Sequence, residues 1–232
     1  WLNKKIWPLE EKFISQGFVE DGAELAIAEM ILSGTTCFAD MYFYPDCVAK
    51  KAIDSNMRVQ LACPVLDFPT IWAQSADEYI QKTITIHDNY RNSELISVAF
   101  GPHAPYTVSD APLTKIGALA EELDIPIHMH VHETEKEISD SMKEFGCRPL
   151  RRLSNLRLVS PRLNCVHATQ LNEGEIELIA ESGSNIVHCP ASNMKLASGI
   201  CNVSQLTKND TNVCLGTDGA ASNNELDLLK EA

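Results

Sequence analysis

The sequence predicts an α/β protein whose single parallel sheet forms a (β/α)8 barrel. Strand-like and helix-like segments alternate strictly along the chain, which requires parallel strands joined by right-handed crossovers. Polar residues with catalytic chemistry stand at the ends of six of seven strand-like segments, whereas a doubly wound sheet gathers such residues at one switch point. These residues are Asp40, His103, His130, His167, His188 and Asp218.

Composition restricts the class of protein and of ligand. The 232 residues are 44% hydrophobic and 22% charged, which suits one globular domain spanning residues 1–232. The net charge of −13 argues against nucleic acid or an anionic membrane as partner, because no basic stripe is available to neutralise phosphates. We expect a small neutral or cationic ligand, and no apolar run approaches the length of a membrane helix.

The eight cysteines show no C-x-x-C pair, and several fall in apolar strand-like runs. That pattern is typical of reduced, buried thiols in a cytoplasmic protein and disfavours both a disulfide framework and a thiolate metal site.

The first half of the chain reads as repeated helix and strand units. The first ten residues are amphipathic and aromatic, and Pro8 is expected to break them. A helix over 20–33 carries Leu25, Ala28 and Leu32 on one face and stops at Gly34. Strands are expected over 35–40, 58–63 and 95–100, with helices over 46–55 and 76–89 between them.

The second half continues the same alternation. Ser109 is expected to cap a helix with Pro112 in its first turn, and helical segments are expected over 135–157. Asn172 opens a helix that Gly183 stops. Strands are expected over 163–167, 185–188 and 212–216. Together with a strand in the segment 126–134 they bring the number of expected strands to seven, one short of a closed barrel.

The segment 126–134, PIHMHVHET, is the most informative stretch. As a strand it would place His128, His130 and His132 on one face, which packing alone does not explain. Glu133 follows where the strand should end, and Thr134 to Glu137 reads as a capping box that opens a helix. Histidine and carboxylate therefore meet at a strand-to-helix junction, where parallel-sheet enzymes keep their chemistry.

These residue types suit a catalytic metal site, which takes histidine nitrogen and carboxylate oxygen and keeps one position for water. His130 and Asp218 supply part of such a site, Glu133 is suited to move protons, and His167 either ligates or hydrogen-bonds the attacking oxygen. The alternative is that strand-end histidines cap carbonyl groups in a crowded rim, which suits Asp40 and His188 best as residues that buttress loops.

Five motifs, in this order, resemble the amidohydrolase superfamily, and within it the 5-methylthioadenosine/S-adenosylhomocysteine deaminases and their triazine-hydrolase relatives. The resemblance covers almost the whole chain. The motifs are G-P-H-A-P-Y-T at 101–107, H-x-x-E-T at 130–134, C-V-H at 165–167, H-C-P-A-S-N-M-K-L-A-S-G at 188–199 and G-T-D-G-A-A-S-N-N at 216–224.

The resemblance implies a role for each site residue. His130 and Asp218 would be ligands of one divalent metal ion, zinc or else iron, with Asp218 also taking a proton from water. Glu133 would shuttle a proton to the purine ring nitrogen, and His167 would orient the hydroxide. The residues implied to touch the nucleoside are His103, Glu10 at the ribose hydroxyls and Trp1.

Two departures from the family pattern stand out. The resemblance places a His-x-His pair on a first barrel strand and adds a small β-domain built from both termini; neither is present here. Because the chain starts at Trp1 and stops at Ala232 inside an apparent helix, we expect a fragment truncated at both ends. The arginine that some relatives place near the end of one strand is Cys63 here, which leaves open how a sulfur-bearing substrate tail is held.

The resulting expectation is a cytoplasmic, metal-dependent hydrolase that deaminates adenine nucleosides of the 5-methylthioadenosine/S-adenosylhomocysteine type and releases ammonia. It would act on a small-molecule substrate, without nucleic acid or membrane partners, either as a single chain or as a homo-oligomer. The alternatives are another amidohydrolase, such as a guanine or cytosine deaminase or a chlorotriazine hydrolase, and a non-catalytic barrel that binds a ligand.

Overall fold

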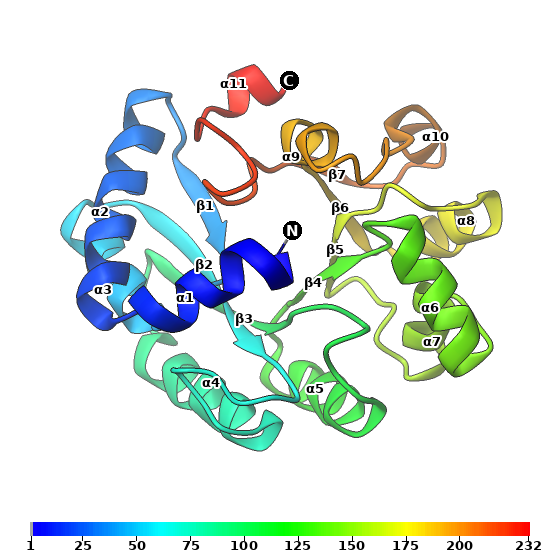
Figure 1. Ribbon diagram of the computed structural model, residues 1–232, viewed down its shortest axis with the longest axis horizontal. Coiled ribbons are helices and arrows are strands. Elements are labelled where there is room, and N and C mark those ends of the chain that lie inside the picture. The colour runs from blue at the N-terminus through cyan, green and yellow to red at the C-terminus, as the bar shows by residue number, and fades with distance from the viewer. Residues whose placement is uncertain (1) are drawn as a thin grey trace.

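Seven parallel strands, hydrogen-bonded to one another in chain order, form the centre of the protein. The computed structural model describes residues 2–232, so the predicted role of Trp1 lies outside the described residues. The sheet curls and carries its helices on the outer side, which confirms a barrel-type parallel architecture (Figure 1). The strands are β1 (Cys37–Asp40), β2 (Arg58–Val65), β3 (Ile96–Pro102), β4 (Ile127–Val131), β5 (Leu163–His167), β6 (Asn185–His188) and β7 (Val213–Leu215).

The helices that precede or join the strands lie close to their predicted positions, except the helix over 203–208, which was not predicted. As predicted, Asn172 opens α8 and Gly183 ends it. Asn172 and Glu175 form a reciprocal capping box there, and Gly183 is in the left-handed conformation. These helices are α2 (Gln16–Leu32), α3 (Pro45–Asp54), α4 (Ala76–Tyr90), α5 (Asp110–Leu123), α6 (Glu135–Phe145), α7 (Pro149–Asn155), α8 (Glu173–Ser182) and α10 (Val203–Lys208).

Short helical elements were harder to predict, because a few residues carry no periodic pattern. Pro8 does not break the N-terminal segment; it lies in the first turn of a helix, where a missing N–H group costs nothing. The short elements are the π-helical turn η1 (Leu2–Ile6), α1 (Trp7–Phe13), α9 (Pro190–Lys195) and α11 (Leu228–Glu231).

Helix α2 begins a turn earlier than predicted, where the Ser15 side chain accepts a hydrogen bond from the Phe18 N–H group. The predicted apolar face is not the buried one. Leu25 and Leu32 are 71% and 88% exposed, whereas Val19, Ile27 and Met30 are buried. The helix is apolar on more than one side, so periodicity did not determine which side packs. No helix within residues 2–232 is long and apolar enough to cross a membrane.

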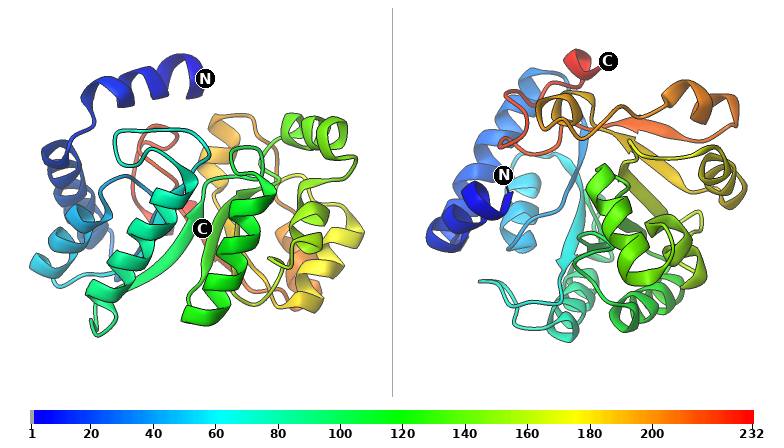
Figure 2. Two further views of the ribbon diagram at one scale, coloured as in Figure 1. Left: turned by 90° about the horizontal axis from the view of Figure 1, so that it is seen from below. Right: turned by 45° about the vertical axis from the view of Figure 1, so that its right-hand side comes forward.

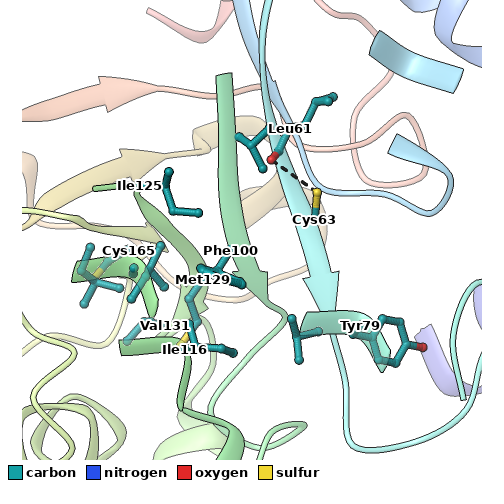
Figure 3. Close-up of a cluster of buried hydrophobic side chains, with 14 of the residues drawn as sticks. Leu61, Cys63, Tyr79, Phe100, Ile116, Ile125, Met129, Val131 and Cys165 are labelled. Atoms are coloured by element: carbon teal, nitrogen blue, oxygen red, sulfur yellow. Dashed lines mark hydrogen bonds between the residues drawn. The ribbon is translucent and has the colours of Figure 1, made fainter. Parts of the chain in front are cut away.

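The core lies between the outer face of the sheet and the helices that cover it. Side chains from the adjacent strands β2, β3, β4 and β5 pack together with side chains from α4 and α5 (Figure 3). Fully buried examples are Leu61 in β2, Phe100 in β3, Met129 in β4, Tyr79 in α4 and Ile116 in α5. This packing fixes the strands, and therefore the positions of the residues at their carboxyl ends.

The first and last strands are the edges of the sheet, and Figure 1 shows β1 and β7 apart. Cys37 in β1 and Cys214 in β7 are exposed, whereas most residues of the inner strands are buried. Near this opening the C-terminal segment meets α2. Leu226 accepts a hydrogen bond from the Ser33 hydroxyl and donates one to the Glu29 carboxylate.

We expect residues 1–232, expressed on their own, to associate or aggregate, because unpaired strand edges template pairing with other chains. Sedimentation velocity over a concentration series measures this. The expected result is a concentration-dependent distribution of large species. A monodisperse monomer at all concentrations would show that the edges of β1 and β7 are protected.

Candidate active site

Three imidazole rings lie side by side at the carboxyl ends of neighbouring strands. His103 follows β3, His130 lies in β4 and His167 ends β5. The ring centroids of His103 and His130 are 5.0 Å apart, and those of His130 and His167 are 5.4 Å apart with planes inclined by only 23°. The expected convergence of these strand-end histidines is confirmed.

One carbonyl oxygen holds His130 in place. The His103 oxygen lies 3.0 Å from the backbone nitrogen of His130 and 2.7 Å from its Nδ1. A carbonyl only accepts, so Nδ1 carries the hydrogen and Nε2 keeps its lone pair. Histidine ligands of metals are oriented in this way, by a backbone carbonyl at the ring nitrogen that does not bind the metal.

His167 is held by a side chain from another element. Its Nδ1 lies 2.8 Å from Oδ1 of Asn193 in α9, and its Nε2 lies 3.9 Å from Oε2 of Glu133. Burial, followed by the neighbouring His130, lowers the pKa of His167, although the nearby carboxylates oppose the shift. The ring is therefore neutral. Nδ1 donates its hydrogen to Asn193 Oδ1, and the Nε2 lone pair lies on the side of the Glu133 carboxylate.

Glu133 is anchored through both its backbone and its side chain, which is 17% exposed. The Glu133 carbonyl accepts a hydrogen bond from Thr169 Oγ1 at 2.7 Å. Its Oε1 accepts one from Ser198 Oγ at 3.2 Å. The carboxylate is thus placed beside His167, and Ser198 bonds only one of its two oxygens.

Asp218, in the loop after β7, approaches the same rim. Its Oδ2 accepts hydrogen bonds from Ser192 Oγ at 2.5 Å and Ser222 Oγ at 2.8 Å, and its Oδ1 accepts one from the Gly219 N–H group at 2.8 Å. Burial alone would raise the pKa of Asp218, but the two serine hydroxyls and the nearby imidazoles hold it below its usual value. Asp218 therefore remains ionised.

The donors fit a metal ion in kind but not in number. His130 presents a free Nε2, and Asp218 presents an ionised carboxylate, both of which zinc accepts. Within residues 2–232, however, no three His, Cys, Asp or Glu side chains are grouped so as to hold a metal ion. Since catalytic zinc takes three or more protein ligands, the described residues supply only part of a site.

His103 faces the same space from the loop after β3. Its Nδ1 lies 3.2 Å from Thr107 Oγ1, and its ring packs edge-on against Tyr106 with centroids 6.1 Å apart. Burial, followed by the neighbouring His130, lowers the pKa of His103 to about 3, so the ring is neutral and can form a hydrogen bond with a ligand through Nε2.

Helix α1 lies over the rim where the strands end (Figure 2). Two contacts with loops that follow strands hold it there. Glu10 Oε1 accepts a hydrogen bond from the Tyr42 hydroxyl at 2.8 Å, and the Trp7 and Phe68 rings lie 6.2 Å apart. The Tyr42 hydroxyl bonds only one of the two carboxylate oxygens of Glu10.

Three other predicted site residues are not brought into this group. Strand β4 ends at Val131, and His132 has a φ of +57°, which ends the alternation. Its ring turns outward, and Nε2 accepts a hydrogen bond from the Leu150 N–H group, so the prediction that it shares a face with His130 was wrong. Asp40 Oδ2 and His188 Nδ1 are buried and have no hydrogen-bond partner within residues 2–232. Neither of these two atoms therefore supports a loop through a hydrogen bond.

Several residues that hold the site were missed from the sequence. Tyr42, Asn193 and Ser198 contact site residues through hydrogen bonds that join segments distant in the chain. Asn193 and Ser198 lie within the motif at 188–199, so this motif could have indicated that they belong to the site. Cys63 is fully buried two residues before β2 ends, so its thiol does not reach the rim.

The geometry and the motifs define a class of protein. The amidohydrolase family model matches residues 1–232. The chain belongs to this family.

Relatives with high sequence identity to the chain are named as deaminases. The chain is 54% identical over its whole length to a 5-methylthioadenosine/S-adenosylhomocysteine deaminase from Saccharophagus degradans, and 42% identical to a 5'-deoxyadenosine deaminase from Methanobrevibacter smithii. It covers 52% and 53% of these relatives, so it spans about half the length of the curated proteins it matches.

Solved structures agree with the fold. A zinc-bound adenosine deaminase from Xanthomonas campestris is 49% identical over the whole chain with a TM-score of 0.98, and 53% of that structure is covered. A guanine deaminase from C. acetobutylicum, with guanine in its active site, is 22% identical with a TM-score of 0.91; 99% of this chain and 57% of that one are covered. At that lower identity the second comparison supports the fold alone.

A buried arginine holds the loop that carries His103. Arg152 in α7 is 4% exposed, and its guanidinium donates to the carbonyls of Pro105 and Val108 and to the Asp110 carboxylate. It also lies over the Phe145 ring, 3.9 Å from the centroid. The outer helix α7 therefore fixes a loop of the rim.

We expect Arg152→Met to lower the free energy of unfolding by about 3 kcal/mol, because it leaves two buried carbonyls without their donor. Arg151→Met, at the exposed neighbouring position, should cost less than about 0.5 kcal/mol. Urea denaturation of both variants measures the difference. Equal losses would show that the clamp contributes no more than a surface arginine.

Proposed function

We propose that the protein containing these residues is a metal-dependent hydrolytic deaminase of adenine nucleosides of the 5-methylthioadenosine/S-adenosylhomocysteine type. The observation that carries this proposal is the placement of the Glu133 carboxylate beside the neutral His167 at the rim that also holds His130 and Asp218. The names of relatives at 43% to 54% identity support the substrate class.

His130 through Nε2 and Asp218 through its carboxylate would hold the metal ion, zinc or alternatively iron, together with ligands outside the described residues. The adenosine deaminase from Xanthomonas campestris, at 49% identity, is zinc-bound, which favours zinc. A bound divalent ion of this kind lowers the pKa of water toward neutrality and so supplies a nucleophile.

The chain's own residues would perform the proton transfers. Water adds to the amino-bearing carbon of the purine, and Glu133 transfers one proton of that water to the adjacent ring nitrogen. Asp218 takes the second proton of the water and gives it to the amino group, which leaves the tetrahedral carbon as ammonia. His167 would orient the attacking oxygen, since Asn193 fixes its Nδ1 hydrogen and leaves Nε2 directed toward the reacting groups.

Substrate binding would involve residues on two sides of the rim. The neutral His103 would hydrogen-bond the substrate, and Glu10 would accept from the ribose hydroxyls through the oxygen that Tyr42 leaves free. Trp1 would lie against the nucleoside. Because Cys63 is buried in the core, other residues must hold the substrate tail.

A second substrate is favoured by a specific comparison. Relatives at 38% to 42% identity are named 5'-deoxyadenosine deaminases, which act on an adenine nucleoside with no thioether tail. Guanine deaminase and triazine hydrolase resemblances lie at 21% to 23% identity and concern the fold. We therefore rank nucleoside deamination above these alternatives and above a non-catalytic ligand-binding barrel.

We also propose that the protein is cytoplasmic, and that its partners are limited to a small nucleoside and, in a homo-oligomer, further copies of itself. All eight cysteines carry free thiols, which suits a reducing compartment.

We expect Glu133→Gln, in the complete product of the gene, to abolish ammonia release while bound metal stays near its original amount, because Glu133 moves protons and does not ligate. Glu135→Gln, at an exposed position two residues later, is the control and should keep full activity. Metal analysis beside an ammonia assay tests both. Metal loss in step with activity would overturn the shuttle role.

We expect Glu10→Ala to lower kcat/KM for an adenine nucleoside roughly 30-fold, about 2 kcal/mol, because a charged hydrogen bond to the ribose is lost. Free-base activity should barely change. Glu11→Ala, at the exposed neighbouring position, is the control. Equal losses on nucleoside and free base would favour a nucleobase deaminase instead.

A further inference from the structure

The strand-to-helix turn that carries Glu133 contains an unusual backbone conformation. His132, between β4 and α6, has a φ of +57°, in the left-handed region that residues other than glycine adopt at a cost. A residue in this conformation turns successive N–H groups toward one side and creates a small concave site for an anion. At this turn the two groups are the N–H groups of His132 and Glu133.

A carboxylate from α6 occupies that concave site. Glu137 Oε1 accepts the hydrogen bond of the His132 N–H group at 2.9 Å, and its Oε2 accepts that of the Glu133 N–H group at 2.8 Å. The predicted capping box is therefore only half present: Thr134 Oγ1 accepts from the Glu137 N–H group, but the Glu137 side chain reaches past Thr134 to the two preceding residues. Glu137 thus stabilises the turn that places Glu133.

The rest of the turn is held from other directions. The His132 carbonyl accepts a hydrogen bond from the Gln170 N–H group at 3.1 Å, and its ring accepts one from Leu150. Glu133 is held at its carbonyl by Thr169 and at its carboxylate by Ser198. Glu137 provides the only contact to the Glu133 N–H group among the hydrogen bonds of the described residues.

The position of Glu137 disfavours the charged form of its carboxyl group. Glu137 is only 6% exposed, and the negative charge of Glu133 lies close to it. Burial raises the pKa of Glu137 to about 7, although the backbone N–H groups that it accepts from oppose the shift. A neutral side chain would satisfy helix capping as well, so capping alone does not account for a buried carboxylate here.

We propose that Glu137 is a positioning residue for Glu133: it binds the two N–H groups of the left-handed turn and so holds the Glu133 carboxylate in its place against His167. The role rests on the proposed function, in which Glu133 transfers the proton. Loss of the two hydrogen bonds should move the Glu133 backbone while leaving His130 and Asp218, which are fixed by other contacts, in place.

The test compares two variants of the complete gene product. Glu137→Gln keeps the shape of the side chain but turns an N–H₂ group toward one of the two backbone donors. Thr134→Ala removes the side-chain cap of the same helix and leaves both bonds from Glu137 intact. It is therefore the control for loss of helix capping.

We expect Glu137→Gln to lower kcat for the adenine nucleoside by 10-fold or more, with KM within threefold and zinc content unchanged. Thr134→Ala should keep kcat within twofold, even with an equal fall in Tm. A kcat loss shared equally by Thr134→Ala and Glu137→Gln, or no kcat loss, would overturn the positioning role.

Amide hydrogen exchange gives a readout that needs no activity. In Glu137→Gln, exchange should quicken 10-fold or more at residue 132 or 133, whichever amide faces the N–H₂ group, and in Thr134→Ala it should stay unchanged at both. Unchanged exchange at both residues in Glu137→Gln would overturn the proposal. Absence of nucleoside turnover in the unmodified protein would instead overturn the proposed function, so the two failures are distinguishable.

Discussion

The hydrogen bonds that converge on the His103 carbonyl join the two halves of the candidate active site. Strands β3 and β4 share a single register pair, Phe100 opposite Ile127, and beyond it their contact continues through the His103 oxygen, which accepts from the His130 backbone and from its Nδ1. The carbonyl oxygen that links the two strands is therefore also the one that orients the ring. A change in the pairing of β3 and β4 would alter the direction of the His130 lone pair.

A second constraint is shared by several residues at the rim that carries the site. His132, His167 and Asp218, none of them glycine, all have positive φ values and all lie at or just after the ends of strands. Such conformations are unfavourable on their own and persist where surrounding contacts determine them. In each case a hydrogen-bonded side chain from another element lies beside the strained residue: Glu137, Asn193 and Ser192. Strain and positioning therefore occur together along this rim.

The sequence was sufficient to predict the sheet and the rim. Apolar runs in the strands and periodic helices between them fix the order of elements, and parallel strands necessarily bring their carboxyl ends to one side. His103, His130 and His167 follow from that rule. The prediction for His132 fails because side chains alternate between faces only while the backbone remains extended. His132 is in the left-handed conformation, which depends on local hydrogen bonds and leaves no periodic pattern in the sequence.

Two other failures have the same origin in tertiary contacts. Helix α2 has apolar residues on more than one side, and only packing against its neighbours selects Val19, Ile27 and Met30 over Leu25 and Leu32. The supporting residues of the site escaped prediction because their partners lie far away in the chain. Ser198 and Glu133 are 65 positions apart, so neither shows by its spacing that it contacts the other.

The segment around α9 has a consequence for how this rim can change. Ser192 holds Asp218, Asn193 holds His167 and Ser198 holds Glu133, so one short stretch of chain contacts residues that come from three different strand ends. A displacement of α9 would reach all three at once, whereas an exchange of one strand-end residue leaves the other two supports intact. Engineering of a new specificity on this scaffold should therefore keep 192–198 fixed and vary the loops that follow β1 and β2, which make no such shared contacts with Glu133, His167 or Asp218 in the described residues.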